Sequence, residues 1–198
     1  MKASDILGET PYLHPGEMPR KMLDGGISLN AIKRDYKKLG QIQDLIVYMD
    51  NHHTHTIVID LTAEVISERY EQVFRLQFKS SNLLKFKNNF TNIIQVDKVA
   101  VLRKAGTQGI ASTVYKMIVD NGFTLVSDVT QFDPAKALWR KLAGDSEYQI
   151  YVADIDNGIF KDDNGNDIVY NGSNILDQNI WTEGSDYNGE YRVLILTK

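Results

Sequence analysis

The chain contains no cysteine among its 198 residues. This absence excludes disulfide bonds, zinc–thiolate sites and cysteine nucleophiles, and it gives no reason to expect an oxidising compartment. Long apolar runs are missing too, because no stretch approaches the roughly 20 residues of a membrane-spanning helix. Residues 1–20 also lack the apolar centre of a signal peptide. We therefore expect a cytoplasmic protein with no membrane partner.

A strong excess of either charge is absent, since the formal net charge is −4. Residues 1–105 carry 15 basic and 12 acidic side chains, whereas residues 106–198 carry 7 and 14. This balance does not indicate a general affinity for nucleic acid. The acidic second half could attract a cationic substrate such as an amine, although a solvated acidic surface is the simpler interpretation.

Proline is scarce, and three of the four prolines precede residue 26. With the pair Gly25-Gly26 they indicate an extended or irregular lead-in. After residue 154, repeated Asn-Gly turns favour hairpins. The expected domains are an N-terminal arm over 1–27, a main domain over 28–154, and a C-terminal β extension over 155–198 packed on the same sheet.

Hydrophobic periodicity predicts the order of the elements. The first half should contain a helix over 28–40, strands over 44–50 and 55–61, a short helix or loop over 63–70, a strand over 71–78 and a loop over 79–92. The second half should contain strands over 96–103, 123–128, 147–154 and 190–197, with helices over 107–121 and 134–143. Asp133 and Pro134 form a strong start signal for the last helix. The alternation of strands and helices from residue 96 predicts an α/β layer.

The stretch "RKAGTQGIAS", residues 103–112, leads from a strand into a helix through two glycines. The first amides of a helix have no internal partner and carry partial positive charge, and small residues let a phosphate approach them. On spacing alone, a plain tight turn is the simpler interpretation. The stretch is neither a Walker loop nor a dinucleotide fingerprint, because the Gly-Lys-Ser/Thr ending and the third glycine are missing.

The longer run "VDKVAVLRKAGTQGIASTVYKMIVDNGFTLVSDVTQFDPAKALWRKLAG" resembles the central region of the GNAT superfamily of acyl-CoA-dependent N-acyltransferases. Gly109 and Ala111 match the last two positions of that family's Gln/Arg-x-x-Gly-x-Gly/Ala loop, while Gly106 replaces the usual Gln or Arg. The helix pattern of the family is kept in register by Ala135, Trp139 and Lys141. The "SDxxQ…ALWxKL" version, with Ser127, Asp128 and Gln131, is similar to acyltransferase-like proteins encoded by bacteriophages.

The resemblance implies an α/β (α+β) fold with a mixed, mostly antiparallel, twisted sheet and helices on both faces. It implies that strands 96–103 and 123–128 splay apart. The loop amides would hold the pyrophosphate of coenzyme A, and backbone amides near Leu102 and Arg103 would bind the thioester carbonyl and the pantetheine. The residues expected to bind acetyl-CoA or another acyl-CoA are Leu102, Arg103, Gly106, Thr107, Gln108, Gly109, Ile110, Ala111 and Ser112.

The departure that matters for catalysis is Trp139. The family's general acid at this position is a tyrosine that protonates the leaving thiolate, and an indole cannot give up a proton at useful pH. Tyr115 and Tyr151 are the candidate replacements. Asp128, at the carboxyl end of a strand, is the candidate base for the attacking amine. The alternative for Asp128 is a surface aspartate that begins the following turn.

Three functions stay open on these residues. The first is acyl transfer, most simply acetyl transfer, from the coenzyme A thioester to an amine of a small molecule, a protein or a nucleic-acid base. The second is a non-catalytic GNAT-like protein that binds a partner or forms part of a bacteriophage particle. The third is an acyltransferase that modifies nucleic-acid bases, for which the basic-aromatic segment 78–87 offers a contact. A homodimer is compatible with each, and a phage-encoded chain would act in the host cytoplasm.

Metal sites are not expected. His52, His53 and His55 lie between two predicted strands, without a carboxylate at supporting spacing, so a polar hairpin turn is the better interpretation. The run "DDNGND", residues 162–167, lacks the 12-residue pattern and the closing Glu of a calcium loop. We expect a turn there as well.

Overall fold

The computed structural model describes residues 23, 26–66, 68–79, 90–102, 107–129, 133–181 and 192–198. Two units can be distinguished by contacts in space. Unit 1 consists of Met1–Phe78 with Asp97–Val114, and unit 2 consists of Lys79–Val96 with Tyr115–Lys198. The domain boundaries expected at residues 27 and 154 rest on the sequence alone and stay predictions.

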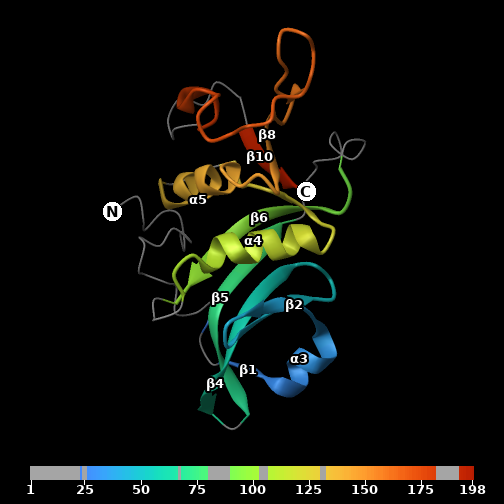
Figure 1. Cartoon of the computed structure of the whole chain (residues 1–198). Helices are drawn as coiled ribbons and strands as arrows, with labels where there is room; N and C mark the ends of the chain where they lie inside the picture. The colour runs from blue at the N-terminus through green and yellow to red at the C-terminus, as the bar shows by residue number, and fades with distance from the viewer. Residues whose placement is uncertain are drawn as a thin grey trace, which may run out of the picture. The chain divides into compact units, whose positions relative to one another are not determined.

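The strands of unit 1 form an antiparallel meander (Figure 1). Across the sheet their order is β2 (Tyr36–Ile42), β3 (Leu45–Asp50), β4 (His55–Ile66) and β5 (Arg69–Lys79). The short β1 (Ile27–Ser28) pairs with β5. The strands expected over 44–50, 55–61 and 71–78 are therefore confirmed, with longer bounds for the last two.

The helix expected over 28–40 is only half present. It is α3 (Leu29–Asp35), and the expected cap is confirmed because the Ser28 side chain accepts the Ala31 N–H at 3.2 Å. The helix ends at Asp35, and the chain continues directly into β2. Pairing with β3 overrides the local helical pattern here. Among the described strands β2 has only β3 as a neighbour, and the exposed Lys37 and Lys38 are typical of such an edge strand.

The expectation of a short helix or loop over 63–70 was wrong. β4 continues to Ile66 and β5 begins at Arg69, with Glu68 at a φ of 61° in the turn between them. The two strands pair at Glu64 with Tyr70 and at Ile66 with Arg69. This pairing across a tight turn extends the hairpin beyond what the local sequence indicates.

The core of unit 1 lies where α3 packs on β4. Ile32 of the helix clusters with Ile57 and Ile59 of the strand, and Val58, which points the other way, is fully buried as well. A strand that is covered on both faces reads as a continuous apolar run, as "IVI" does here at residues 57–59.

The sheet of unit 2 is mixed and mostly antiparallel. Its strand order is β6 (Ile93–Val101, of which residues 93–96 belong to this unit), β7 (Thr124–Val126), β10 (Arg192–Thr197), β8 (Gln149–Asp154) and β9 (Gly158–Ile159). Only β6 and β7 are parallel among these described pairs. Together with the helices, this confirms an α+β class with a mixed sheet.

The last strand lies inside the sheet of unit 2. β10 pairs with β7 on one edge and with β8 on the other, and Figure 1 shows β8 and β10 side by side. Its residues Val193–Leu196 are all buried. The expectation that a final strand completes the sheet is confirmed, but by insertion between two earlier strands.

The remaining helices are α4 (Ile110–Asp120) and α5 (Asp133–Ala143), both close to their expected bounds. Gly122 ends α4 as expected, at a φ of 86° and with its N–H donated to the Val119 carbonyl at 2.9 Å. After β9, the chain forms isolated bridges and the short helix η2 (Asp177–Asn179). No helix in the described part of the chain combines the length and apolarity needed to cross a membrane.

Candidate functional site

The predicted phosphate loop is described from Thr107 onward, because residues 103–106, with Arg103 and Gly106, lie outside the described part. Gly109 has a φ of 73°, a conformation that favours glycine, and it directly precedes the first helical residue of α4. Gly109 and Gln108 are exposed, whereas Thr107, Ile110 and Ser112 are buried. The structure thus places a glycine turn at the start of a helix, as the sequence predicts.

Some donors expected in this loop are already used within unit 1. The Ile110 N–H donates to the Thr107 carbonyl at 3.3 Å, and the Ser112 hydroxyl donates to the Gly109 carbonyl at 2.8 Å. The Leu102 N–H, expected to meet the thioester, donates to the Val73 carbonyl at 2.8 Å. A ligand at the turn would therefore have to use other donors, such as the backbone at Gln108, Gly109 and Ala111.

The helix after this loop has no acidic side chain in its first turn to offset the partial positive charge at its start. The first turn of α4, which begins with Ile110 and Ala111, contains no acidic residue. By contrast, α5 begins with Asp133. An anion near the first turn of α4 would meet the partial positive charge of the helix without competition from that turn.

In unit 2, the candidate base Asp128 lies just beyond β7 and is held in place. Lys79 Nζ lies 2.5 Å from Asp128 Oδ1, and the same oxygen accepts the Val129 N–H at 2.8 Å. The Asp128 side chain is 16% exposed and that of Lys79 is 34% exposed. The carboxylate is thus neither buried nor fully solvated, and a cation neighbours it.

A buried polar junction stands beside Asp128, where the parallel strands stop pairing. β6 and β7 pair through three positions that end at Gln95 and Val126. Gln95 Nε2 donates to the Ser127 carbonyl at 3.0 Å, while Ser127 exchanges bonds with Leu194 of β10 through its N–H and its hydroxyl. Sequence reasoning missed this junction. The available signal was Gln95 itself, a polar residue between the apolar Ile94 and Val96.

Tyr115 and Trp139 pack together in the interior of unit 2. Their ring centroids are 5.7 Å apart in an edge-to-face arrangement, and both residues are buried. Burial, with the negative charge of Asp128 as a second cause, raises the pKa of the Tyr115 hydroxyl well above its usual range. Tyr115 and Asp128 therefore belong to one electrostatic neighbourhood, and Tyr115 keeps its proton.

Tyr151 lies on β8 with a different set of contacts. Its hydroxyl donates to Gln149 Oε1 at 2.7 Å, and its ring lies 5.7 Å from that of Phe90. Burial and the charge of Asp167 raise its pKa. Its role as a general acid stays a prediction, and these contacts add no support for it.

The remaining motifs are explained by local structure. His55 belongs to β4, and residues 51–54 form the expected turn before it. The described residues contain no group of three or more His, Cys, Asp or Glu side chains placed to hold a metal ion. Asp162 accepts the N–H groups of Asn164 and Asn166, which makes "DDNGND" a turn. Of the basic-aromatic segment, residues 80–89 lie outside the described part.

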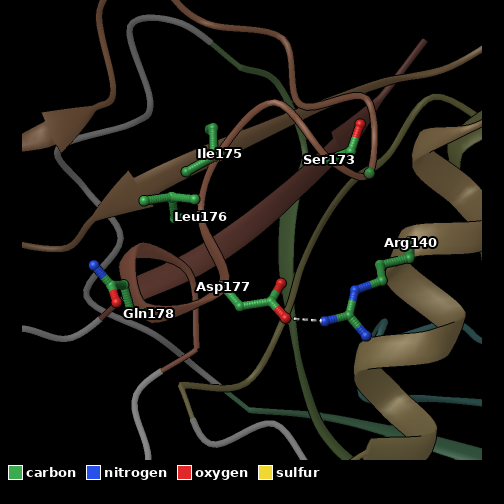
Figure 2. A pocket seen from close by; sticks show the side chains of 7 residues that line it. Arg140, Ser173, Ile175, Leu176, Asp177 and Gln178 are labelled. Carbon is green, nitrogen blue, oxygen red and sulfur yellow. Dashed lines mark hydrogen bonds and ion pairs between the residues drawn. The ribbon is translucent and has the colours of Figure 1, made fainter.

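A pocket of about 570 Å³ lies in unit 2 beside α5 (Figure 2). Across it, Arg140 Nη2 lies 2.5 Å from Asp177 Oδ2, and Trp181 Nε1 donates to Asp177 Oδ1 at 3.0 Å. None of the candidate site residues lines this pocket. Its lining consists of Arg140, Gly172, Ser173, Ile175, Leu176, Asp177 and Gln178.

Comparison with known proteins gives no match to a protein-family model, to a curated protein or to a solved structure.

Proposed function

We propose that the chain is an acyl-CoA-dependent N-acyltransferase of the GNAT type, which transfers an acetyl or other acyl group to an amine. The observation that carries this proposal is the segment that runs from β6 through α4 to β7. Two parallel strands are joined by a helix that a positive-φ glycine introduces, and the strands pair through only three positions.

The turn before α4 is the proposed site of the pyrophosphate. Gly109 is exposed and has no side chain, so a phosphate can approach the backbone there. The partial positive charge of the helix start favours an anion, and no acidic residue of the first turn opposes it.

Asp128 is the proposed base. The amine nitrogen attacks the thioester carbonyl, the new C–N bond forms, and the C–S bond breaks to release the thiolate. Asp128 accepts the proton that the amine loses, directly or through water. The thiolate can leave without strong assistance and takes its proton from water, because the buried Tyr115, whose pKa is raised, is a poor donor.

Isothermal titration with acetyl-CoA tests the binding step. Gly109→Asp should abolish binding, because its carboxylate would face the pyrophosphate. The matched control is Gly122→Asp at the other end of α4, which adds the same charge at a similar φ, 86° against 73°. A side chain at residue 122 would meet nothing within 4 Å. The control should bind like the wild type, and absence of wild-type binding at millimolar acetyl-CoA would refute the proposal.

A non-catalytic GNAT-like binding or structural protein is the second candidate. Two observations favour it: Trp139 is only 1% exposed, and Lys79 already occupies the carboxylate of Asp128. A position committed to the core cannot deliver a proton to a substrate. A stoichiometric protein partner on purification, together with no binding of coenzyme A, would support this candidate over the enzyme.

A further inference from the structure

One face of the unit 1 sheet carries three polar side chains beside α3. Tyr36 packs against the cluster of Ile32, Ile57 and Ile59, and His55 lies on the same face of β4 as Ile57. Arg75 of β5 stands directly opposite Ile57 in the strand register and so shares that face. Three strands thus bring Tyr36, His55 and Arg75 together.

A directed chain of hydrogen bonds runs through two of these residues. The Thr54 hydroxyl donates to Asp50 Oδ2 at 2.9 Å, so it must accept from the Nδ1–H of His55, 3.0 Å away. His55 Nε2 then has a free lone pair, which accepts the Tyr36 hydroxyl at 2.6 Å. The neighbouring groups therefore assign the neutral Nδ1–H tautomer to His55.

Within the described residues, Arg75 is a cation without an anionic partner. Its Nε is buried with no hydrogen-bond partner, and no acidic side chain forms an ion pair with it among the residues that the structure describes. Its charge nevertheless acts on both His55 and Tyr36. A partly buried guanidinium normally has a carboxylate or phosphate partner, because an unpaired charge is costly to remove from water.

We propose that Arg75, Tyr36 and His55 form a binding site for a small oxyanion, a carboxylate or a phosphate group. The guanidinium offers paired donors in the fork geometry that such groups accept. The Tyr36 hydroxyl supplies a further donor once it turns away from His55. Asp50 and Thr54 fix the imidazole from the other side.

Binding takes up one proton. When His55 is protonated, Nε2–H donates to the Tyr36 oxygen, and the Tyr36 hydrogen is released toward the anion. Asp50 Oδ1, 3.6 Å from Nδ1, balances the new positive charge. Without a ligand, burial and Arg75 lower the pKa of His55, and a bound anion reverses the second of these causes.

The groups around His55 are few, and each comes from a neighbouring element. Asp50 faces it from β3, Tyr36 from β2 and Arg75 from β5, and Asp35 at the end of α3 acts on Tyr36. Asp50 stays ionised, because the N–H groups and the hydroxyl that it accepts outweigh the effect of burial and lower its pKa. Near neutral pH, His55 is therefore the group that takes the proton, and oxyanions should bind more tightly at pH 6 than at pH 8.

NMR titration of the His55 imidazole with acetate and, separately, with inorganic phosphate tests the proposal. At constant ionic strength, both should shift the His55 resonances saturably, and acetate should bind more tightly at pH 6. Acetate keeps one negative charge between pH 6 and pH 8. A higher affinity for acetate at pH 6 therefore shows that the protein takes up a proton on binding. The stronger of the two ligands identifies the carboxylate or the phosphate as the natural group. A linear, non-saturating response to both would overturn the proposal.

Two variants identify the residues. Arg75→Gln should weaken binding at least tenfold, whereas Arg34→Gln, which removes an exposed guanidinium that already pairs with Asp35, should weaken it far less. Tyr36→Phe keeps all charges and should weaken binding and reduce its pH dependence, while the part that the anion exerts through Arg75 on His55 remains. Equal losses of affinity in Arg75→Gln and Arg34→Gln would show that the anion responds only to the overall charge of the protein. That result would overturn the proposed site. If the Arg75→Gln variant does not fold, the affinity of Tyr36→Phe and the wild-type affinities for acetate at pH 6 and pH 8 test the proposal instead.

Discussion

Lys79 and Asp128 form an ion pair within unit 2, with Nζ 2.5 Å from Oδ1, although 49 positions separate them in the chain. The same carboxylate oxygen accepts the Val129 N–H. Asp128 is therefore held by two donors at the end of β7, whereas a surface aspartate that only begins a turn needs no distant cation. This geometry makes Asp128 the carboxylate to test first.

Asp128→Asn should lower the rate of acyl transfer by about 100-fold or more, because an amide cannot accept the proton of the attacking amine. Affinity for acetyl-CoA should stay unchanged, since we propose that the pyrophosphate binds at the turn before α4, at Gly109. Thiol release in the presence of an amine measures the rate, and calorimetry measures the affinity. The control is Asp145→Asn, which also removes a carboxylate paired with a lysine, Lys116, in unit 2. A rate unchanged in Asp128→Asn would remove Asp128 from the mechanism.

Local signals in the sequence predicted those parts of the fold that are decided locally. The β-rich runs around residues 51–54 gave the hairpin, Asp133-Pro134 gave the start of α5, and Gly122 gave the end of α4. The prediction failed where pairing between strands determines the structure. Residues 36–40 were predicted to be helical but pair with β3, and no local pattern reveals that β10 is inserted between β7 and β8.

The same division holds for the candidate sites. The glycine turn at Gly109 is a local feature, and the sequence predicted it. The partners of Asp128 and the approach of Arg75 to His55 depend on which strands are neighbours, so spacing could not supply them. Trp139 could be recognised as a departure from the GNAT pattern that the sequence resembles, but its burial against Tyr115 required the packed structure.

Trp139→Ala should destabilise the protein by about 3–5 kcal/mol, because it leaves a large cavity in the core of unit 2. The residue is 1% exposed and packs edge-on against Tyr115. Urea denaturation followed by circular dichroism measures the free energy of unfolding. Leu176→Ala is the control: this side chain is 64% exposed, so the change should stay within about 0.5 kcal/mol. Similar effects of the two variants would show that Trp139 is not a core residue.

Gly122→Ala should destabilise the protein by about 1 kcal/mol through backbone strain alone. The φ of Gly122 is 86°, while an added Cβ would meet nothing within 4 Å, so steric contact adds nothing. Gly144 ends α5 without a positive φ, and its Cβ would lie 3.6 Å from the Lys141 carbonyl oxygen, an ordinary contact. Gly144→Ala should therefore be neutral or slightly stabilising. Thermal denaturation of both variants tests this, and a larger loss in Gly144→Ala would contradict the assignment of the two helix ends.

Tyr148→Phe should change the dependence of stability on pH in the alkaline range. Burial, with the hydrogen bond that the hydroxyl donates to Asp120 at 3.0 Å as a second cause, raises the pKa of Tyr148 to about 12. In the unfolded chain the pKa of a tyrosine is about 10. Between these values the unfolded state loses the proton while the native state keeps it, so the native state binds more protons and stability falls as the pH rises.

At pH 8, Tyr148→Phe should be less stable than the wild type by about 1 kcal/mol, the typical net value of one hydrogen bond. The difference should shrink between pH 10 and pH 12, because only the wild type carries the hydroxyl whose ionisation favours unfolding. The ring remains in the variant, so the contacts of Lys116 and Lys198 with its face are kept. Urea denaturation of both proteins from pH 8 to pH 11.5 measures the difference. A constant difference over this range would show that Tyr148 does not keep its proton through the bond to Asp120.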